Sequence, residues 1–368
     1  MRMWPCLALM LIWTSLSAET KPMYYYGADL SYVNEMEDCG ASYSVDGREG
    51  DPFELLSEKG ANLVRVRLWN DPEWTPYSDL DDVKKTIART RKAGMQVLLN
   101  FHYSDDWADG EKQLIPEAWA DMQNVDELAK ALYDFTYQTL LALHADGLMP
   151  ELVQVGNETN KEILSTLEKA HQPIDWDRNA KLLNAGIRAV RDAGKKTDTA
   201  PRVMLHIAQP ENVEPWFAAA SQAGVTDFDL IGISYYRRWS TQDMDGLIET
   251  IERVSQRYSA DVLVVEAAYP WTLAGEDEMS NLLGQSTLIE GYPATKEGQR
   301  RYLIDLTQRI VTSGGVGLVY WEPAWISTRC KTRWGTGSAW ENATLFDFDG
   351  RLLPGADFFS HPYVYPED

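Results

Sequence analysis

The 368-residue sequence is short of cysteine, of cations and of long apolar runs, and each shortage excludes a class of protein. It has 34 Lys and Arg against 56 Asp and Glu, a net charge of −22 that argues against nucleic acid or an anionic membrane surface as a partner. Only the N-terminus carries an apolar run, so no other segment is predicted to span a bilayer. No Gly-rich phosphate-binding loop follows the first predicted strand, which disfavours a dinucleotide-binding sheet.

The N-terminal run has the pattern of a secretory signal peptide. A basic residue precedes a short apolar stretch over residues 6–13, and a Ser-x-Ala sequence ends at Ala18. The stretch is too short for a stable transmembrane helix. We therefore predict cleavage of residues 1–18, a catalytic domain over residues 19–368, and export to the periplasm or the medium.

Apolar strands alternate with amphipathic helices along the rest of the chain. The predicted strands cover residues 24–30, 64–69, 95–101, 152–155, 202–207, 229–234, 262–265 and 317–320. The predicted helices cover residues 51–59, 79–93, 124–146, 178–193, 215–223, 247–258 and 296–313. Eight such strands predict a single-domain α/β fold, a (β/α)8 TIM barrel, rather than an open doubly wound sheet.

Two of the predicted strands end in a glutamate. Residues 152–155 lead through Gly156 and Asn157 to Glu158, and residues 262–265 lead directly to Glu266. Strand ends of a barrel gather at one face, so the two carboxylates are expected to lie together. A retaining glycoside hydrolase needs such a pair about 5–5.5 Å apart, one protonated and one ionised.

Polar and aromatic residues that suit sugar chemistry occupy the other strand ends. As substrate-binding or supporting residues we select Asp29, Arg65, Arg67, His102, Asp105, Trp107, Asn157, His206, Tyr235 and Trp321. Comparable residues at the same positions are Tyr103, Asp106, Asn160, Ser234, Tyr236 and Glu322. The 14 Trp and 18 Tyr of the chain, many of them in polar stretches, suit the apolar faces of sugar rings.

Several of these residues have an expected role. The ionised carboxylate needs hydrogen-bond donors, and we expect Tyr235 and an arginine of the second strand to supply them. Asn157 is expected to bind the sugar 2-hydroxyl, and Trp321 to form the floor of the pocket. His102 and His206 are alternatively metal ligands, but no third histidine or cysteine accompanies them, so the chemistry is predicted to need no cofactor.

Seven motifs, in order along the chain, resemble glycoside hydrolase family 53, the arabinogalactan endo-β-1,4-galactanases. They lie at residues 27–31 (GADLS), 64–72 (VRVRLWNDP), 99–105 (LNFHYSD), 106–109 (DWAD), 154–160 (QVGNETN), 320–325 (YWEPAW) and 345–350 (LFDFDG). The resemblance implies endo-hydrolysis of β-1,4-galactan with retention. It also implies Glu158 as acid/base and Glu266 as nucleophile.

The sequence departs from the family at two loops. Where many members have Tyr-Pro-Phe-Trp after the sixth strand, this chain has Tyr236, Arg237, Arg238 and Trp239. Some bacterial relatives bind calcium between the loops after strands seven and eight. The corresponding weak candidates for a structural calcium site here are Asp277, Asn281, Ser338 and Glu341.

Two alternatives to a galactanase remain open at this stage. A β-mannanase or β-1,4-glucanase of the same barrel clan would carry the same pair of glutamates. A non-catalytic galactan-binding protein is disfavoured because both glutamates are retained. With a polysaccharide as its partner, the protein is expected to be a monomer.

Two cysteines remain after removal of the signal peptide and Cys6. Cys39 follows the first predicted strand and Cys330 follows the eighth, and these strands are neighbours where a barrel closes. In an oxidising compartment they pair with each other or stay as two exposed thiols. We predict a Cys39–Cys330 disulfide.

Overall fold

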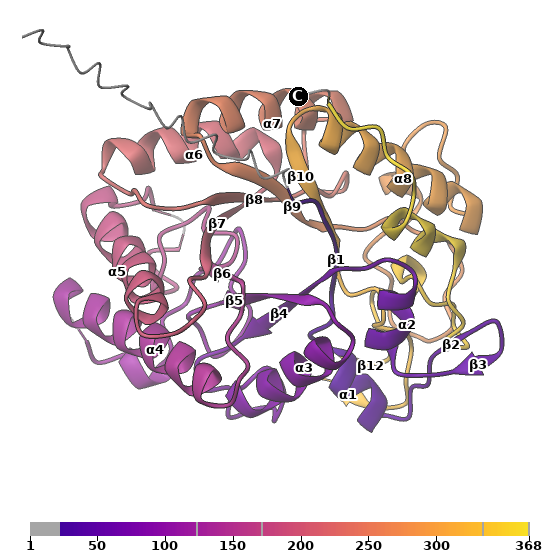
Figure 1. Ribbon diagram of the computed structural model, residues 1–368, viewed down its shortest axis with the longest axis horizontal. Coiled ribbons are helices and arrows are strands. Elements are labelled where there is room, and N and C mark those ends of the chain that lie inside the picture. Colours follow the sequence, from indigo (N-terminus) through magenta and orange to yellow (C-terminus); the bar gives the residue numbers. More distant parts are fainter. Residues whose placement is uncertain (1–22, 123, 171, 333–334, 367–368) are drawn as a thin grey trace, which may run out of the picture.

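The computed structural model describes residues 23–122, 124–170, 172–332 and 335–366. The predicted signal peptide, residues 1–18, lies outside these ranges. Figure 1 looks along the barrel, with helices in a ring around the strands. The eight strands form a closed parallel barrel in the order β1-β10-β9-β8-β7-β6-β5-β4, which confirms the predicted fold.

The barrel strands fall where the apolar runs predict them, within two residues at each end. They are β1 (Tyr25–Asp29), β4 (Leu63–Leu68), β5 (Gln96–Phe101), β6 (Leu152–Val155), β7 (Arg202–Ala208), β8 (Leu230–Ser234), β9 (Asp261–Ala267) and β10 (Gly315–Tyr320). β1 pairs in parallel with both β4 and β10, so the first and last strands close the ring. Their adjacency brings the loops that carry Cys39 and Cys330 together.

The described residues form eight outer helices, and six of them begin at a residue whose side chain accepts a backbone N–H of the first turn. Their bounds are α1 (Val33–Asp38), α2 (Pro52–Glu58), α3 (Leu80–Lys92), α4 (Val125–Ala145), α5 (Trp176–Gly194), α6 (Pro210–Gln222), α7 (Met244–Tyr258) and α8 (Lys296–Thr312). Such N-caps are Asp51, Asp79, Asn124, Asp175, Asp243 and Thr295. Each cap satisfies a donor that the helix itself leaves unpaired.

Helix α6 begins five residues before its predicted start. The sequence predicts Pro215 as the first helical residue. In the structure Pro210 occupies that position and Pro215 lies inside the helix. Proline is favoured at the first position because its missing N–H has no partner there in any case. With two prolines in one segment, that preference alone does not choose between them.

The barrel interior changes from apolar at one end to polar at the other. Each of the eight strands contributes to an apolar cluster: Tyr25, Leu63, Leu98, Leu152, Met204, Leu230, Leu263, Val265, Val316 and Val319. Further along the same strands toward their carboxyl ends come Arg65, Asn100, Gln154 and His206, all at most 1% exposed. The apolar plug closes the barrel, and the polar residues above it face the end where the glutamates lie.

Two short hairpins and a disulfide cover the loops of the carboxyl face. The hairpins are β2 (Ser44–Val45) with β3 (Arg48–Glu49), and β11 (Lys331–Thr332) with β12 (Gly335–Thr336). Cys39 and Cys330 form the predicted disulfide, with their Cα atoms 5.4 Å apart. Within the part of the chain that the structure describes, no helix has the length and apolarity needed to cross a bilayer.

Candidate active site

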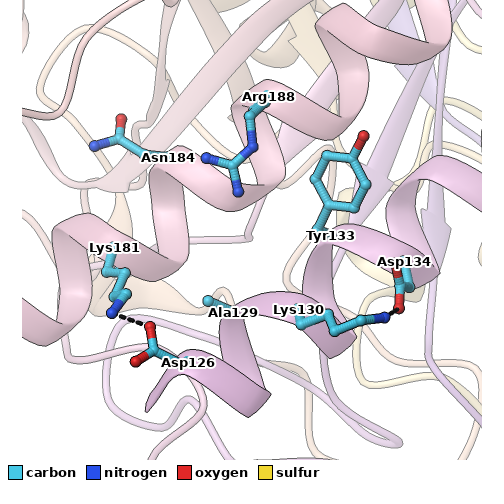
Figure 2. A pocket seen from close by; sticks show the side chains of 8 residues that line it. All are labelled: Asp126, Ala129, Lys130, Tyr133, Asp134, Lys181, Asn184 and Arg188. Carbon is cyan, nitrogen blue, oxygen red and sulfur yellow. Dashed lines mark hydrogen bonds and ion pairs between the residues drawn. The ribbon is translucent and has the colours of Figure 1, made fainter.

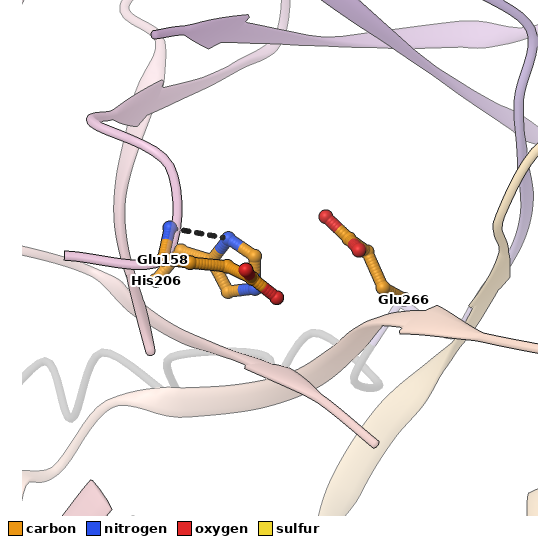
Figure 3. A group of neighbouring side chains, drawn as sticks. All are labelled: Glu158, His206 and Glu266. Carbon is orange, nitrogen blue, oxygen red and sulfur yellow. Dashed lines mark hydrogen bonds between the residues drawn. The ribbon is translucent and has the colours of Figure 1, made fainter. Parts of the chain in front are cut away.

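Glu158 and Glu266 approach each other at the carboxyl face of the barrel (Figure 3). One oxygen of each carboxylate and a ring nitrogen of His206 all lie within 4.8 Å of one another. Retaining glycosidases hold their carboxyl groups about 5–5.5 Å apart, and inverting enzymes about 6.5–9.5 Å apart. The spacing in this chain therefore belongs to the retaining class.

A tight turn after β6 delivers Glu158 to this position. Gly156 has φ +83°, and a Cβ there would lie 2.5 Å from Thr159 Cγ2, so only glycine fits. Glu158 itself has φ +43°, a left-handed conformation that a side chain with a Cβ rarely adopts. Such strain persists where surrounding contacts hold it, and here the Glu158 N–H donates to His206 Nδ1 at 3.2 Å.

Within the described structure, the hydrogen-bond partners of the Glu158 carboxylate are neutral groups. Ser234 Oγ donates to Oε1 at 2.6 Å, and the Gly110 N–H donates to Oε2 at 3.1 Å. Burial, followed by the negative charge of Glu266, raises the pKa of Glu158 to about 8, although the Ser234 hydrogen bond opposes this. Glu158 is therefore protonated at neutral pH, as a general acid must be.

The carboxylate of Glu266 has a cation beside it. Arg65 Nη1 lies 2.8 Å from Oε1, and the Tyr236 hydroxyl donates to Oε2 at 3.0 Å. Burial raises the pKa of Glu266, while Arg65 and the Tyr236 hydrogen bond lower it. Of the two glutamates, Glu266 is the one whose ionised form is paired, which suits a nucleophile.

Arg65 joins Glu266 to the turn that carries Glu158. Its guanidinium is fully buried and also bonds Asp29 Oδ2 at 2.9 Å, Asn157 Oδ1 at 2.6 Å and Gln154 Oε1 at 3.1 Å. Two carboxylates hold the positive charge in place, and burial without them would be costly. A single arginine of β4 thereby fixes residues from β1, β6 and β9 relative to one another.

His206 is a hydrogen-bonding residue in this arrangement, with both ring nitrogens engaged. Nδ1 accepts from the Glu158 N–H and from Gln154 Nε2 at 3.0 Å, so the proton resides on Nε2, which lies 2.9 Å from Ser234 Oγ. Burial and the charge of Arg65 lower the pKa of His206 well below its ordinary value. The nitrogen lone pair that a metal would need is already used, so we assign no catalytic metal to this cluster.

Comparison with known proteins identifies the family. The chain matches the sequence model of glycosyl hydrolase family 53 over residues 25–359. It belongs to glycosyl hydrolase family 53. An arabinogalactan endo-β-1,4-galactanase of Cellvibrio japonicus (strain Ueda107) is 53% identical over 343 residues, which are 92% of this chain and 91% of that protein.

Solved structures agree with this assignment. The family 53 catalytic domain of Ignisphaera aggregans superimposes with a TM-score of 0.85 and 33% identity, covering 94% of this chain and 98% of that domain. A structure from a study of two fungal β-1,4-galactanases superimposes with a TM-score of 0.78 and 26% identity. The match covers 92% of this chain and 99% of that one. Family 53 enzymes are retaining glycoside hydrolases, in agreement with the carboxylate spacing.

Seven aromatic rings form a continuous row across the family 53 site. In order of contact they are Trp74, Trp69, Trp107, Trp321, Trp340, Tyr236 and Trp239, with adjacent ring centroids 4.7–6.0 Å apart. The two ends of the row, Trp74 and Trp239, are 40% and 46% exposed. The row includes the predicted Trp107 and Trp321, which are partly buried. Trp69, Tyr236 and Trp340 are buried, so the rings that can meet a sugar face are Trp107, Trp321 and the two exposed ends.

Arg67 has a different role from Arg65. Its Cζ lies 4.7, 4.5 and 4.2 Å from the ring centroids of Tyr32, Trp69 and Trp107, and its Nη1 lies 3.6 Å from Glu322 Oε1. Burial, together with the charge of Asp29, raises the pKa of Glu322 well above the usual range. Arg67 thus supports the aromatic row from beneath and does not contact the nucleophile.

One predicted donor is wrong, and two other predicted site residues are held by hydrogen bonds within the protein. Tyr235 does not donate to Glu266: its hydroxyl is buried without a hydrogen-bond partner among the described atoms, and Tyr236 donates instead. Asp105 accepts the N–H groups of Asp71 and Glu117 at 2.9 and 2.7 Å, so it braces loops. Asn157 already accepts three bonds at Oδ1, which leaves only an Nδ2 hydrogen for the sugar hydroxyl.

Two residues of the site escape the strand-end pattern. Asn100 and Gln154 lie inside β5 and β6, where Gln154 Nε2 donates to Asn100 Oδ1 at 2.7 Å and Asn100 Nδ2 donates to Asn157 Oδ1 at 3.0 Å. Buried His102 joins this layer through Nε2, which lies 3.1 Å from Asn100 Nδ2, and its Nδ1 accepts from the Ala108 N–H at 3.2 Å. A polar amide within an otherwise apolar strand is the signal that identifies such residues.

The deep groove on the outside of the barrel is a poor alternative site. It has a volume of about 530 Å³, lies between α4 and α5, and is lined by Tyr133, Arg188 and charged residues such as Lys130 (Figure 2). Its charged groups pair with one another, as in Lys181 with Asp126. It holds no pair of juxtaposed carboxylates and lies outside the ring of strands.

The loops after β9 and β10 contain the calcium candidates. Asp277 is occupied by hydrogen bonds, accepting the N–H groups of Met279 at 2.7 Å and Ser338 at 2.8 Å. Glu341 Oε2 and Asn281 Oδ1 are buried, and each lacks a partner within the described structure. The oxygen donors that fit a cation are therefore Glu341 and Asn281, whereas Asp277 and Ser338 hold the loops together.

Proposed function

We propose that the protein is an exported arabinogalactan endo-β-1,4-galactanase in which Glu158 is the acid/base and Glu266 the nucleophile. The observation that carries the roles is the unequal pairing of two carboxylates within 4.8 Å, with Arg65 on Glu266 alone. The substrate follows from the 53% identity to the Cellvibrio japonicus galactanase over nearly the whole chain.

The first half of the reaction uses both carboxyl groups. Glu266 attacks the anomeric carbon while Glu158 gives its proton to the departing glycosidic oxygen, which leaves a galactosyl ester on Glu266. Arg65 and Tyr236 hold the attacking carboxylate in one orientation. The remaining Nδ2 hydrogen of Asn157 is available to the 2-hydroxyl of the sugar.

The second half depends on a change in the pKa of Glu158. Esterification removes the negative charge of Glu266, which is one of the causes of the raised pKa. The Glu158 pKa then falls, so the ionised carboxylate can take a proton from water. That water attacks the galactosyl ester, and the product keeps its β-configuration.

The bond cleaved belongs to neutral galactan and not to an acidic pectin backbone. A net charge of −22 repels a polyanion over distances of about a Debye length. The direct test compares reducing-sugar release from β-1,4-galactan, carboxymethylcellulose, mannan and polygalacturonate. Rapid hydrolysis of galactan alone is expected, and faster hydrolysis of any other substrate would refute the assignment.

Export and a monomeric state are part of the same proposal. The disulfide supports export, because disulfides persist in oxidising compartments. N-terminal sequencing of the protein from culture medium or periplasm should begin at residue 19, and intact full-length protein in the cytoplasm would contradict this. Light scattering should give the mass of one chain.

A structural calcium ion is proposed for the loops after β9 and β10. Glu341 and Asn281 would hold it, because their buried oxygens lack other partners in the described chain. The ion would join the two loops without entering the chemistry. Calcium should raise the melting temperature of the chelated protein and leave that of Glu341→Gln unchanged; an equal rise in both would exclude this site.

A further inference from the structure

The loop between β8 and α7 carries two arginines that the galactanase chemistry does not use. We call Arg237, Arg238 and Trp239 the arginine ledge; all three side chains are exposed. Trp239 is 46% exposed, which is unusual for a tryptophan in a folded domain.

The ledge continues directly from the reaction centre. Tyr236, the residue before it, donates its hydroxyl to the nucleophile Glu266 at 3.0 Å. The ring of Trp239 packs edge-on against Tyr236 with centroids 5.2 Å apart, and Trp239 is the last member of the aromatic row. The exposed ring of Trp239 therefore lies one ring contact away from the residue that holds Glu266.

Backbone carbonyls hold both guanidinium groups in place without neutralising them. Arg237 Nη1 donates to Ser240 O at 2.7 Å, and Arg238 Nη1 donates to Leu282 O. Arg238 also lies over the Trp239 ring, with Cζ 5.3 Å from the centroid. Each guanidinium has five N–H donors, so most of its donors remain available.

Neither arginine has a carboxylate partner within 4 Å among the described residues, although acids outnumber cations by 22 in the chain. The acids of the adjoining segments are committed elsewhere. Glu211 accepts from Thr241 N at 2.7 Å and from Ser240 Oγ at 2.8 Å, and Asp243 caps α7 through the Gly246 N–H. The ledge is thus a local cationic surface on a strongly anionic protein.

We propose that the arginine ledge binds the carboxylate of a uronic acid residue attached to the galactan chain. The proposal rests on the galactanase function. The acidic sugar unit would lie at the end of the cleft, beyond the neutral bond that is cleaved. An arginine fork matches a carboxylate with two parallel hydrogen bonds. Trp239 offers its ring to the apolar face of the same sugar. The negative charge elsewhere on the protein confines acidic sugars to this position.

The test uses a double variant, Arg237→Gln with Arg238→Gln, and a control of equal charge, Arg188→Gln with Arg257→Gln. The control arginines are also exposed and stack on tyrosines, Arg188 over Tyr133 and Arg257 over Tyr258. All proteins are first assayed on neutral galactan. Loss of that activity in the wild type would refute the galactanase proposal, whatever the ledge binds.

The ledge itself is tested by calorimetric titration with trigalacturonate at low salt, with inorganic sulfate as a competitor. We expect the double variant to bind the trimer at least about tenfold more weakly than wild type and control, and to hydrolyse neutral galactan at an unchanged rate. Equal binding by the double variant and the wild type would overturn the proposal. Displacement by sulfate at the same concentration would also overturn it, because the site would then bind an adventitious ion only.

Discussion

The two halves of the active site contain the same residue type and differ in everything around it. Glu158 receives a hydroxyl and a backbone N–H, whereas Glu266 receives a guanidinium and a phenol. Both carboxylates lie at the same face, Glu266 buried and Glu158 half-buried, with an oxygen of each within 4.8 Å of the other. The proposed division into acid and nucleophile therefore rests on the neighbouring residues, above all on Arg65, and not on the glutamates themselves.

The halves also depend on different parts of the barrel. The acid half rests on β6, β7 and β8, where a chain of contacts runs from His206 through Ser234 to Glu158. The nucleophile half rests on β1, β4 and β9, where Asp29 and Glu266 share Arg65. Substitutions in one half should thus leave a recognisable signature that differs from that of the other.

The largest expected losses of activity come from substituting the two glutamates, and the two variants should differ in the substrates they still hydrolyse. Glu266→Ala should lose nearly all activity, at least about 10⁴-fold, on every substrate. Glu158→Ala should lose about 10²–10⁴-fold on galactan but retain activity on aryl galactosides, whose good leaving groups need no proton. Parallel kinetics on galactan and on an activated aryl galactoside distinguish the two; equal losses on both substrates would reverse our assignment of roles.

Removing Arg65 is the next largest change and should affect Glu266 most, with a smaller effect on the turn that carries Glu158, because Arg65 also bonds Asn157. Arg65→Met leaves Asp29 and Glu266 buried without their cation, which costs about 3–5 kcal/mol of stability. The pKa of Glu266 should rise, so the acidic limb of the kcat/KM profile moves to higher pH. Arg65→Lys, which keeps the charge, is the control and should recover part of both effects; an unchanged acidic limb in Arg65→Met would contradict the assigned role.

The nucleophile half shows how far sequence reasoning reaches. The barrel and the positions of Glu158, Glu266 and Arg65 follow from apolar runs that end in polar residues, since strand ends of a parallel barrel must meet. The sequence pattern predicts Tyr235 as the hydrogen-bond donor to Glu266, whereas Tyr236 is the donor in the structure. The register of β8 against β9 shifts between Ile233 and Ser234, so simple alternation fails to tell which of the next two side chains faces inward.

The hydrogen-bond network around Asn157 cannot be predicted from the sequence, for a different reason. Asn100 and Gln154 act through hydrogen bonds to each other and to Asn157, and those pairings join strands that are far apart in sequence. A strand pattern gives the face on which a side chain lies but not its partner across the barrel. The disulfide could be predicted because only two cysteines remain and barrel closure makes their strands neighbours.

Loss of the disulfide should have a smaller effect on activity and should leave the acid half untouched. Cys39→Ala with Cys330→Ala opens a link across 291 residues and costs about 2–5 kcal/mol by loop-closure arguments. Nearby, Tyr32 of the β1 loop stacks on Trp325 of the β10 loop with centroids 4.2 Å apart. Denaturant unfolding without reductant should show this decrease in the free energy of unfolding. The alkaline limb of kcat/KM should stay in place, and a shift would mean that these loops also tune Glu158.

The smallest expected effect comes from Ser234, whose substitution should change the pKa of Glu158. Ser234→Ala removes the hydrogen bond that Ser234 donates to Glu158 Oε1 at 2.6 Å and leaves the buried His206 Nε2–H without its acceptor, which should cost about 1–3 kcal/mol of stability. That bond favours the ionised carboxylate and lowers its pKa, so the pKa of Glu158 should rise from about 8 in the variant. The acid then keeps its proton to higher pH, and the alkaline limb of kcat/KM moves upward while kcat at the optimum falls about tenfold or less. Ser234→Thr retains a hydroxyl and should stay close to the wild-type profile. A downward shift in Ser234→Ala would show that the hydroxyl stabilises the protonated acid, because only that form would then lose a favourable contact.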